Sequence, residues 1–503
     1  MLPGFVVLLA YAAHFARYDF LSDDCFIGFR YARNLADGLG LVWNPAERVE
    51  GYTNFLWVLT LSIGIRIGIP PEELSRGLGF LAGALVLVTT ASLSARCTGW
   101  RDPFVWAAPA LLAANRSFAA WSSGGLETQA FSFLVLAGYA LLLRDPPSPH
   151  APRAASALVL ALATLTRPEG ALFAACAAAL LLSEVLARRA SPRRFLAWGA
   201  LYALPVTAHL LWRHAYYGFW LPNTFYAKVP GLHFSRGLEY LRLFHEDFAA
   251  LWLLPPVVAL VLWRRQRSDL LFGGALAAFL AYVAAIGGDR FDFRMLVPVL
   301  PLFYWLVAEA IAAAAQLLPA RRRVVSLALL GGVLLVTALG SNRPEARVGR
   351  GPIESLEETR RYGRGRIEQG LYLRALVDKG VLPTDLRIGV SGAGAVPYYT
   401  RWYTVDRLGL NDVKIARQPV LQRGVPGHER EATPEDLAAR RVALNDVFSR
   451  IVFEDDPQLP ARIARTGVGG ARSLRVDDHC LVFTTTLSER EYTRLFAGLS
   501  SCF

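Results

Sequence analysis

The sequence predicts a polytopic α-helical membrane protein with a water-facing C-terminal domain. Hydrophobic residues make up 54% of the 503 residues, and the mean hydropathy is +0.33. A soluble chain of this length could not bury so much apolar surface in one core. Apolar runs recur through the first two thirds of the chain, whereas the last third is polar. We therefore expect a membrane body over residues 1–340 and an extracytoplasmic α/β or α+β domain over residues 341–503.

The apolar segments can be read in order from the N-terminus. They cover residues 2–18, 54–69, 77–95, 103–121, 129–143, 154–166, 170–187, 195–212, 248–263, 269–286, 295–318 and 324–340. The first lacks a small-residue cleavage site and predicts a transmembrane helix, not a cleaved signal peptide. Segment 54–69 contains Arg66 and ends before two prolines, so we expect it to lie at the outer face without crossing. About eleven helices then span the bilayer.

Arginine clusters in the loops predict the orientation. They occur at Arg96 and Arg101, at Arg144 and Arg153, at Arg188, Arg189, Arg193 and Arg194, at Arg264, Arg265 and Arg267, and at Arg321, Arg322 and Arg323. The positive-inside rule places these loops in the cytoplasm. The N-terminus is then cytoplasmic and the C-terminal domain periplasmic, at the inner membrane of a bacterium. The same clusters explain the net charge of +12, so nucleic acid is not an expected partner.

The C-terminal domain carries its own local signals. Strands are predicted at 387–390, 473–476 and 480–483, and a helix at 433–448. The cysteines show no CxxC or metal-ligand spacing. Cys97 and Cys176 fall in or near membrane segments, whereas Cys480 and Cys502 could form a disulfide if this domain is extracytoplasmic.

With this topology the loops rich in polar residues share the outer face, namely 19–53, 122–128, 167–169, 213–247 and 287–294. Ionisable residues that converge on one face of a membrane protein indicate a functional site. Asp23 and Asp24 open the first of these loops. Their mutual repulsion would make one carboxylate more basic, as a proton acceptor needs to be. The alternative is that Ser22, Asp23 and Asp24 only cap the following helix.

Several short motifs recur in order along these loops. They are Asp23–Asn34, Gly38–Pro45, Glu47–Thr53, Gly124–Thr128 (GGLET), Leu165–Gly170 (LTRPEG), Leu221–Lys228 (LPNTFYAK), Gly287–Asp289 (GGD), Gly392–Tyr398, Asp406–Asp412 and Gly427–Glu429. The ordered set covers nearly the whole chain and resembles the GT-C glycosyltransferases, in particular the branch that contains the mycobacterial terminal arabinofuranosyltransferases. The likeness departs at Arg290, Phe291 and Asp292, which follow Asp289 in place of the expected variants.

The resemblance implies a GT-C fold and a polyprenyl-phosphate sugar donor. It implies transfer of a single sugar, such as arabinofuranose, with inversion to an envelope glycan, glycolipid or protein acceptor, with a first-loop aspartate as general base. The expected catalytic residues are Asp23, Asp24 and Glu127. The expected donor phosphate- or sugar-binding residues are Arg30, Arg167, Glu169, Asn223, Tyr226, Lys228, Asp289, Arg294 and His428.

The residue chemistry agrees with a phosphate-linked donor. Arg167, Lys228, Arg290 and Arg294 lie at the outer ends of apolar segments, where cations could meet the charge of a leaving phosphate. They could instead extend to lipid headgroups, and we expect Glu169 to pair with Arg167. No sequence feature requires a metal, although a divalent cation held with Asp24 stays open. The alternatives are a ligase or polymerase of lipid-linked glycans, a polytopic transporter and a scaffold.

Overall fold

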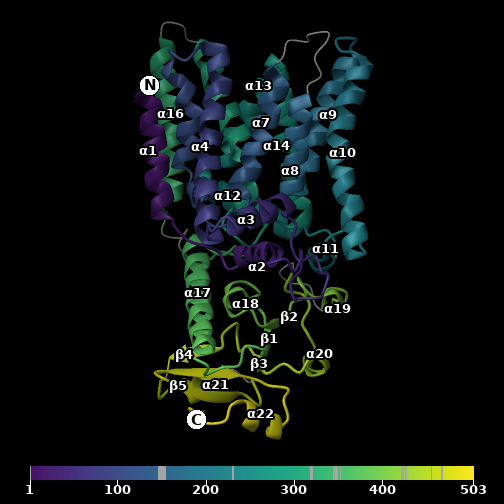
Figure 1. Ribbon diagram of the computed structural model, residues 1–503. Helices are drawn as coiled ribbons and strands as arrows, with labels where there is room; N and C mark the ends of the chain where they lie inside the picture. The colour runs from purple at the N-terminus through teal and green to yellow at the C-terminus, as the bar shows by residue number, and fades with distance from the viewer. Residues whose placement is uncertain are drawn as a thin grey trace.

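The computed structural model describes residues 2–144, 154–228, 231–317, 321–343, 349–351, 353–420, 424, 427–454, 456–465 and 468–503. A bundle of long helices forms the membrane body, and a smaller domain hangs from one end of it (Figure 1). Arg153 of the predicted cytoplasmic clusters lies outside the described residues, as does the side chain of Cys97.

The predicted apolar segments all form helices. The body contains α1 (Leu2–Arg17), α3 (Phe55–Arg66), α4 (Pro71–Thr98), η1 (Pro103–Trp106), α5 (Ala107–Ala114), α6 (Arg116–Ala120), α7 (Thr128–Arg144), α8 (Ala154–Thr166), α9 (Gly170–Leu186), α10 (Pro192–Tyr217), α12 (Phe234–Phe248), α13 (Ala250–Arg264), α14 (Arg267–Ile286), η2 (Arg294–Val299), α15 (Leu300–Gln316) and α16 (Arg322–Ser341). Five of the described helices are long and apolar enough to cross a membrane, or six if α12 and α13, bent by 94°, make one span. Six further apolar helices have 10–17 residues.

The predicted continuous segment 103–121 is wrong, because the chain breaks at Asn115. This residue is extended (φ −81°, ψ 120°), and its side chain accepts a hydrogen bond from the Phe118 N–H to begin α6. Apolar residues lie on both sides of the break, but Asn115, Arg116 and Ser117 interrupt the run and are the local signal for it. The break turns the short helix α6, with Arg116 as its first residue, into the interior of the body, where Arg116 is 2% exposed.

Two short helices lie across the end of the bundle that faces the C-terminal domain (Figure 1). One is α2 (Cys25–Ala36), and the other is α3, whose 12 residues are too few to span a bilayer. Eight residues of α2 are buried, from Cys25 to Ala32. The helix α11 (Asn223–Lys228) is at the same level, below α10. This layer separates the body from the C-terminal domain and carries several predicted site residues.

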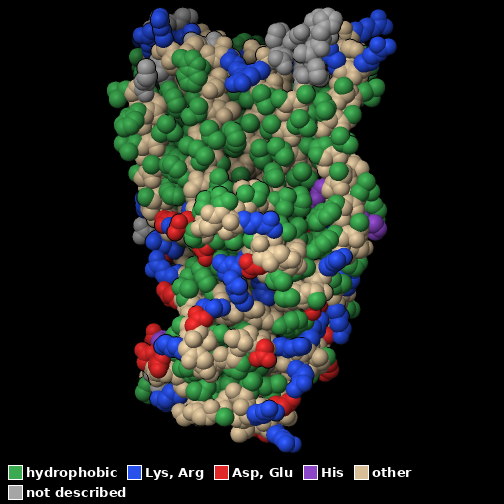
Figure 2. Space-filling view, viewed as in Figure 1, with side chains coloured by type: hydrophobic (Ala, Val, Ile, Leu, Met, Phe, Trp, Pro, Cys, Tyr) green, Lys and Arg blue, Asp and Glu red, His purple; other side chains and the backbone are tan. Residues whose placement is uncertain are grey.

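The surface separates into zones along the long axis of the molecule. Figure 2 shows apolar side chains covering the body, with Lys and Arg gathered at the end away from the C-terminal domain. Large apolar side chains face outward on α10, α13 and α16, including Leu204 at 72%, Trp252 at 76% and Leu327 at 65% exposure. Such a belt is what helices in contact with lipid present. Acidic side chains appear mainly where the belt ends and on the C-terminal domain.

The C-terminal domain begins with α17 (Leu356–Asp378), which starts with a capping box formed by Ser355 and Glu358. A parallel sheet of order β2-β1-β3 follows, and an antiparallel sheet of order β4-β6-β5 lies farthest from the body. The elements are β1 (Arg387–Val390), α18 (Ala395–Thr400), β2 (Tyr403–Asp406), α19 (Val413–Ala416), α20 (Pro434–Ala439), β3 (Leu444–Asn445), β4 (Val452–Glu454), α21 (Leu459–Arg465), β5 (Arg472–Val476), β6 (His479–Phe483) and α22 (Glu489–Leu495).

Some of the predictions for this domain are confirmed and one is wrong. The three predicted strands are confirmed as β1, β5 and β6. The predicted helix at 433–448 is wrong beyond Ala439, because the chain turns there and enters the central sheet as β3. The disulfide between Cys480 and Cys502 is confirmed, with a sequence separation of 22 residues.

Removing the disulfide is expected to destabilise this domain. A closed loop of this size restricts the unfolded chain enough to contribute about 3 kcal/mol to the free energy of unfolding. The double variant Cys480→Ser/Cys502→Ser should therefore unfold at a lower temperature in detergent. Cys176→Ser, which removes a free thiol from α9, is the control, and an equal melting temperature for both variants would contradict the expectation.

Candidate active site

Asp24 lies between α1 and α2, at the border of the body and the C-terminal domain. Its Oδ1 accepts a hydrogen bond from Arg290 Nη2 at 3.0 Å, and its side chain is 28% exposed. Asp24 occupies the N-cap position of α2, but no side-chain cap hydrogen bond forms there. The helix-cap explanation of this acid is therefore wrong. The carboxylate is held by a cation from a residue 266 positions away and keeps an open face.

The partner of Asp24 comes from the 287–294 loop, which follows α14. Gly288 has a φ of +70°, and a Cβ built there would lie 2.5 Å from the Tyr240 ring, so the tight turn needs glycine. Asp289 Oδ1 accepts from the backbone N–H of Arg290 at 2.8 Å, and Asp289 Oδ2 accepts from Arg294 Nε at 2.8 Å. Arg290 Nη1 lies 3.0 Å from His428 Nε2 of the C-terminal domain. The loop thus presents two guanidinium groups beside Asp24.

Lys228, at the end of α11, completes the group. It is exposed, its charge acts on Asp24 and Asp289, and Gly427 packs on its side chain. We call Asp24, Lys228, Asp289, Arg290 and Arg294 the Asp24 cluster. Its three cations, from α11 and the 287–294 loop, gather around Asp24. Such a group of cations can hold an anion close to Asp24.

The charges of the cluster set the state of its acids. Burial acts to raise the pKa of Asp24, but the cations Arg290, Lys228 and Arg294 together hold this pKa below its ordinary value. Asp289 responds in the same way, because burial is outweighed by Arg294 and Lys228, and its pKa is lowered. Asp24 is therefore an ionised carboxylate at neutral pH and can accept a proton. The expectation that repulsion makes this acceptor more basic is wrong for Asp24, because the cations outweigh Asp23; of the two acids it is Asp23 whose pKa is raised, mainly by burial.

Glu127, Arg167 and Glu169 form a second, more enclosed group. Arg167 Nη2 is 2.9 Å from Glu169 Oε1, and Arg167 Nη1 is 3.4 Å from Glu127 Oε1. Asn54 Nδ2 donates to Glu127 Oε2 at 2.7 Å. The expected pairing of Arg167 with Glu169 is confirmed. Arg294 and Asp289 act electrostatically on this group, which places it next to the Asp24 cluster.

Other predicted site residues hold the C-terminal domain instead of joining the cluster. Asp23 is 5% exposed, and its Oδ1 accepts from the Ala395 N–H at 2.8 Å. A Cβ at Gly394 would lie 2.1 Å from the Asp23 carbonyl oxygen, so this contact also needs glycine. Burial raises the pKa of Asp23, while Arg366 and the Ala395 N–H act to lower it.

Arg30, Asn223 and Tyr226 lie at the same interface. Arg30 donates to the carbonyl oxygens of Pro397 and Trp402, both at 2.9 Å. Asn223 Nδ2 donates to the carbonyl oxygens of residues 409, 410 and 412 at 2.9, 3.0 and 3.3 Å. The Arg417 guanidinium stands over the Tyr226 ring at 4.3 Å. In this structure these three side chains are engaged by the C-terminal domain.

Glu354 is a candidate that the sequence did not suggest. Its backbone N–H donates to the Arg290 carbonyl oxygen at 2.6 Å. Burial raises the pKa of its carboxyl, while Arg290 acts to lower it and Asp24 to raise it. Glu354 therefore lies beside the Asp24–Arg290 pair. It precedes α17 in a polar stretch without a motif, so no local signal could identify it. Among the residues that the structure describes, no three His, Cys, Asp or Glu side chains are grouped to hold a metal ion.

Comparison with known proteins agrees with the fold and with the motifs. Residues 360–480 match a domain of unknown function (DUF8728). Over 276 residues the chain is 33% identical to the terminal beta-(1->2)-arabinofuranosyltransferase of Mycobacterium tuberculosis (strain ATCC 25618 / H37Rv), which covers 50% of this chain and 42% of that protein. Over 342 residues it is 28% identical to the enzyme of the same name from Corynebacterium glutamicum, covering 58% of this chain and 48% of that protein. The match thus spans less than half the length of these relatives.

Solved structures show the same architecture. The crystal structure of ArnT from Cupriavidus metallidurans bound to undecaprenyl phosphate matches with a TM-score of 0.58 at 13% identity, covering 97% of this chain and 98% of that one. The apo structure of ArnT also matches with a TM-score of 0.58, covering 96% and 97%. The expected resemblance to GT-C glycosyltransferases, and to the terminal arabinofuranosyltransferase branch, is confirmed. The fold is that of ArnT.

Proposed function

We propose that this chain is a membrane glycosyltransferase with the GT-C fold. It moves a single sugar, arabinofuranose, from a polyprenyl-phosphate donor to a glycan, glycolipid or protein acceptor of the cell envelope, with inversion. The observation that carries this proposal is the Asp24–Arg290 pair, set among the cations Lys228 and Arg294 where the apolar belt ends. An ionised acid next to cations at this level suits a lipid phosphate that leaves as a proton is taken up.

The chemistry follows from the cluster. The acceptor oxygen attacks the anomeric carbon of the donor, and its proton passes to the Asp24 carboxylate. The bond between the anomeric carbon and the phosphate oxygen breaks, and its electron pair stays on the lipid phosphate. Lys228, Arg290 and Arg294 stabilise that charge. Attack on the face opposite the leaving phosphate inverts the anomeric centre. Glu127 and Glu169, which pair with Arg167, accept hydrogen bonds from sugar hydroxyls in this proposal.

We place the membrane body at residues 1–340 and the C-terminal domain at residues 341–503, on the periplasmic side of the inner membrane. The arginine-rich connections α9–α10 and α13–α14 lie at the end of the body away from this domain. The disulfide supports the assignment, because such bonds persist in oxidising compartments.

The proposal is tested by incubating purified full-length protein with radiolabelled decaprenyl-phosphoryl-arabinose and a cell-envelope extract. We expect one labelled pentose to appear on an envelope acceptor, with its anomeric configuration inverted. A ligase or polymerase of lipid-linked glycans would instead transfer only a longer, preassembled chain. A transporter would carry the labelled lipid across proteoliposomes without cleaving it. Either of these results, or no transfer at all, would overturn the proposal.

The pKa of Asp24 predicts the pH dependence of transfer. A carboxyl whose pKa is lowered stays ionised until the pH falls through that value, so kcat/KM should hold its plateau through the ordinary pKa of an aspartate and decline only at lower pH. Arg290→Met removes the largest charge that lowers this pKa, and the acidic limb should move towards neutral pH. Arg242→Met, a change on the exposed face of α12, should leave the limb in place. Identical limbs for Arg290→Met and the unmodified protein would refute the role of Asp24 as base.

A further inference from the structure

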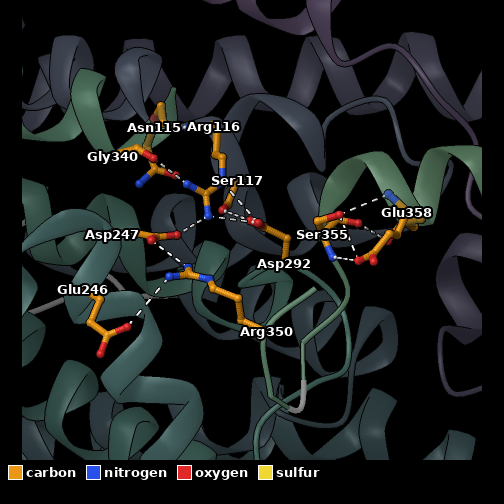
Figure 3. A network of polar contacts seen from close by, with 12 residues as sticks. Asn115, Arg116, Ser117, Glu246, Asp247, Asp292, Gly340, Arg350, Ser355 and Glu358 are labelled. Carbon is orange, nitrogen blue, oxygen red and sulfur yellow. Dashed lines mark hydrogen bonds and ion pairs between the residues drawn. The ribbon is translucent and has the colours of Figure 1, made fainter. Parts of the chain in front are cut away.

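A buried ion network surrounds Arg116 (Figure 3). Arg116 Nε and Nη2 donate to Asp292 Oδ2 at 3.1 and 3.0 Å, and Nη2 also pairs with Asp247. Arg350 Nη2 pairs with Asp247 Oδ1 at 2.7 Å. We call these four residues the Arg116 network. Arg116, Asp247 and Asp292 are at most 2% exposed.

The network joins segments that are far apart in the sequence. Arg116 is the first residue of α6, after the break at Asn115, and its Nη1 donates to the Gly340 carbonyl oxygen of α16 at 2.7 Å. Asp247 comes from the end of α12, and Arg350 from the segment that leads into α17. Three of these charges are buried, whereas Arg350 is 26% exposed and also lies 3.8 Å from Glu246. Burying three charges is costly and adds little to stability compared with apolar packing. The network therefore indicates a role other than stability.

Asp292 connects the network to the 287–294 loop. Its Oδ1 accepts from Ser117 Oγ at 2.7 Å, and its carbonyl oxygen accepts from Trp121 Nε1 at 2.7 Å. Both its side chain and its backbone are therefore fixed by α6 and the residues after it. This residue stands where the sequence departs from the variants expected of its relatives. Its partner Arg116 could not be identified from the sequence, because the two are 176 positions apart.

The fixed loop in turn fixes the two guanidinium groups of the Asp24 cluster. Arg290 and Arg294 stand over the ring of Phe291 at 4.6 and 4.7 Å, and Phe291 packs against Trp121 at 5.4 Å. Phe293, on the other side of Asp292, has a φ of +39°, a conformation that a bulky residue adopts only when its surroundings impose it. Asp292 thus anchors the centre of the loop between two rings, and the cations project from either end.

We propose that Asp292 and Arg116 are positioning residues, which hold Arg290 and Arg294 where the lipid phosphate of the donor binds. The proposal rests on the proposed function and deepens it. In this proposal neither Asp292 nor Arg116 contacts the donor or the acceptor. They act by keeping the geometry of the cations, and a displacement of about 1 Å can reduce a rate by about 100-fold. Arg350 ties the same network to the C-terminal domain.

A matched control separates positioning from stability. Asp269, at the start of α14, is also fully buried and pairs with Arg264 at 2.6 Å, but it lies at the opposite end of the body, next to the α13–α14 connection. Asp292→Asn and Asp269→Asn each remove one charge from a buried ion pair. Both full-length variants are purified in detergent, and their melting temperatures, kcat and the KM values for decaprenyl-phosphoryl-arabinose and for acceptor are measured.

We expect similar losses in melting temperature for the two variants but different kinetics. Asp292→Asn should lower kcat/KM for the donor by about 10- to 100-fold and leave the KM of the acceptor unchanged. Asp269→Asn should leave both kcat/KM for the donor and the KM of the acceptor unchanged. Equal kinetic losses in the two variants would overturn the positioning role while leaving the proposed function intact. An unmodified protein without transfer activity would instead overturn the proposed function.

A milder variant decides the matter if Asp292→Asn does not accumulate. Ser117→Ala removes one hydrogen bond to Asp292 and leaves the ion pair with Arg116 in place. We expect a smaller loss, about 3- to 10-fold in kcat/KM for the donor, again without a change in the KM of the acceptor. Donor kinetics identical to those of the unmodified protein would refute the proposal.

Discussion

Replacing Asp24 with Asn is expected to lower kcat/KM for sugar transfer by about 100- to 10,000-fold without unfolding the protein. The amide has the shape of the carboxylate but cannot take up the proton of the acceptor hydroxyl. The substitution also removes one negative charge from beside the cations that bind the donor phosphate, which does not weaken donor binding. The KM of the donor should therefore change less than kcat. The measurement is initial-rate transfer from labelled decaprenyl-phosphoryl-arabinose, together with the melting temperature of the purified variant.

Asp19→Asn provides the matched control for this change. Asp19 belongs to the same loop and pairs with Arg76, but its side chain is 36% exposed and contacts none of the Asp24 cluster. Surface ion pairs of this kind contribute little to stability, so we expect full activity. If Asp24→Asn retained more than a tenth of the normal kcat/KM, another group would have to accept the proton, and Glu354 is the acid beside it.

Replacing Arg30 with Met is expected to produce the largest loss of stability, about 3–5 kcal/mol. All of the guanidinium donors are in use, on carbonyl oxygens of Trp43, Pro397 and Trp402 and on side-chain oxygens of Asn44 and Thr404. Methionine fills a similar volume but donates nothing, and the three buried carbonyl groups lose a partner each. The melting temperature in detergent should fall, and limited proteolysis should release the C-terminal domain sooner.

Arg66→Met tests whether the effect is specific to this arginine. Arg66 ends α3 and makes a single exposed hydrogen bond, to the Leu35 carbonyl oxygen at 3.4 Å. Its replacement should leave melting and proteolysis unchanged. An Arg30→Met protein that melts like Arg66→Met would show that the C-terminal domain is held mainly by other contacts, such as those of Asp23.

Much of the fold could be predicted from hydropathy, because a bilayer demands long apolar helices and loops carry the charge. The prediction of one continuous segment misses the interruption at Asn115, although Asn115, Arg116 and Ser117 break the apolar run there and Asn115 is a favoured N-cap residue. The helix predicted over residues 440–448 is wrong for another reason. Local propensity there suits a helix, but pairing with β1 gives the chain a better set of hydrogen bonds.

The site was foreseeable in part. Acids and cations at the outer ends of helices indicated Asp24, Arg167, Lys228 and Arg294, because ionisable residues that converge on one face of a membrane body mark a functional site. The interface roles of Asp23, Arg30 and Asn223 were hidden, since their partners lie 372, 367 and 186 positions further along the chain. A sequence motif therefore identifies residues with a specific role, but it does not distinguish a residue that binds substrate from one that holds the C-terminal domain.

The contacts that Asp23, Arg30 and Asn223 make with the C-terminal domain have a consequence for engineering. Transplanting the C-terminal domain of a relative onto this body would leave each of these side chains facing a foreign backbone, and the graft would dock poorly. A workable chimera would have to exchange α2 and α11 together with that domain. Since Lys228 ends α11, such an exchange would also replace this cation of the Asp24 cluster with the other protein's residue.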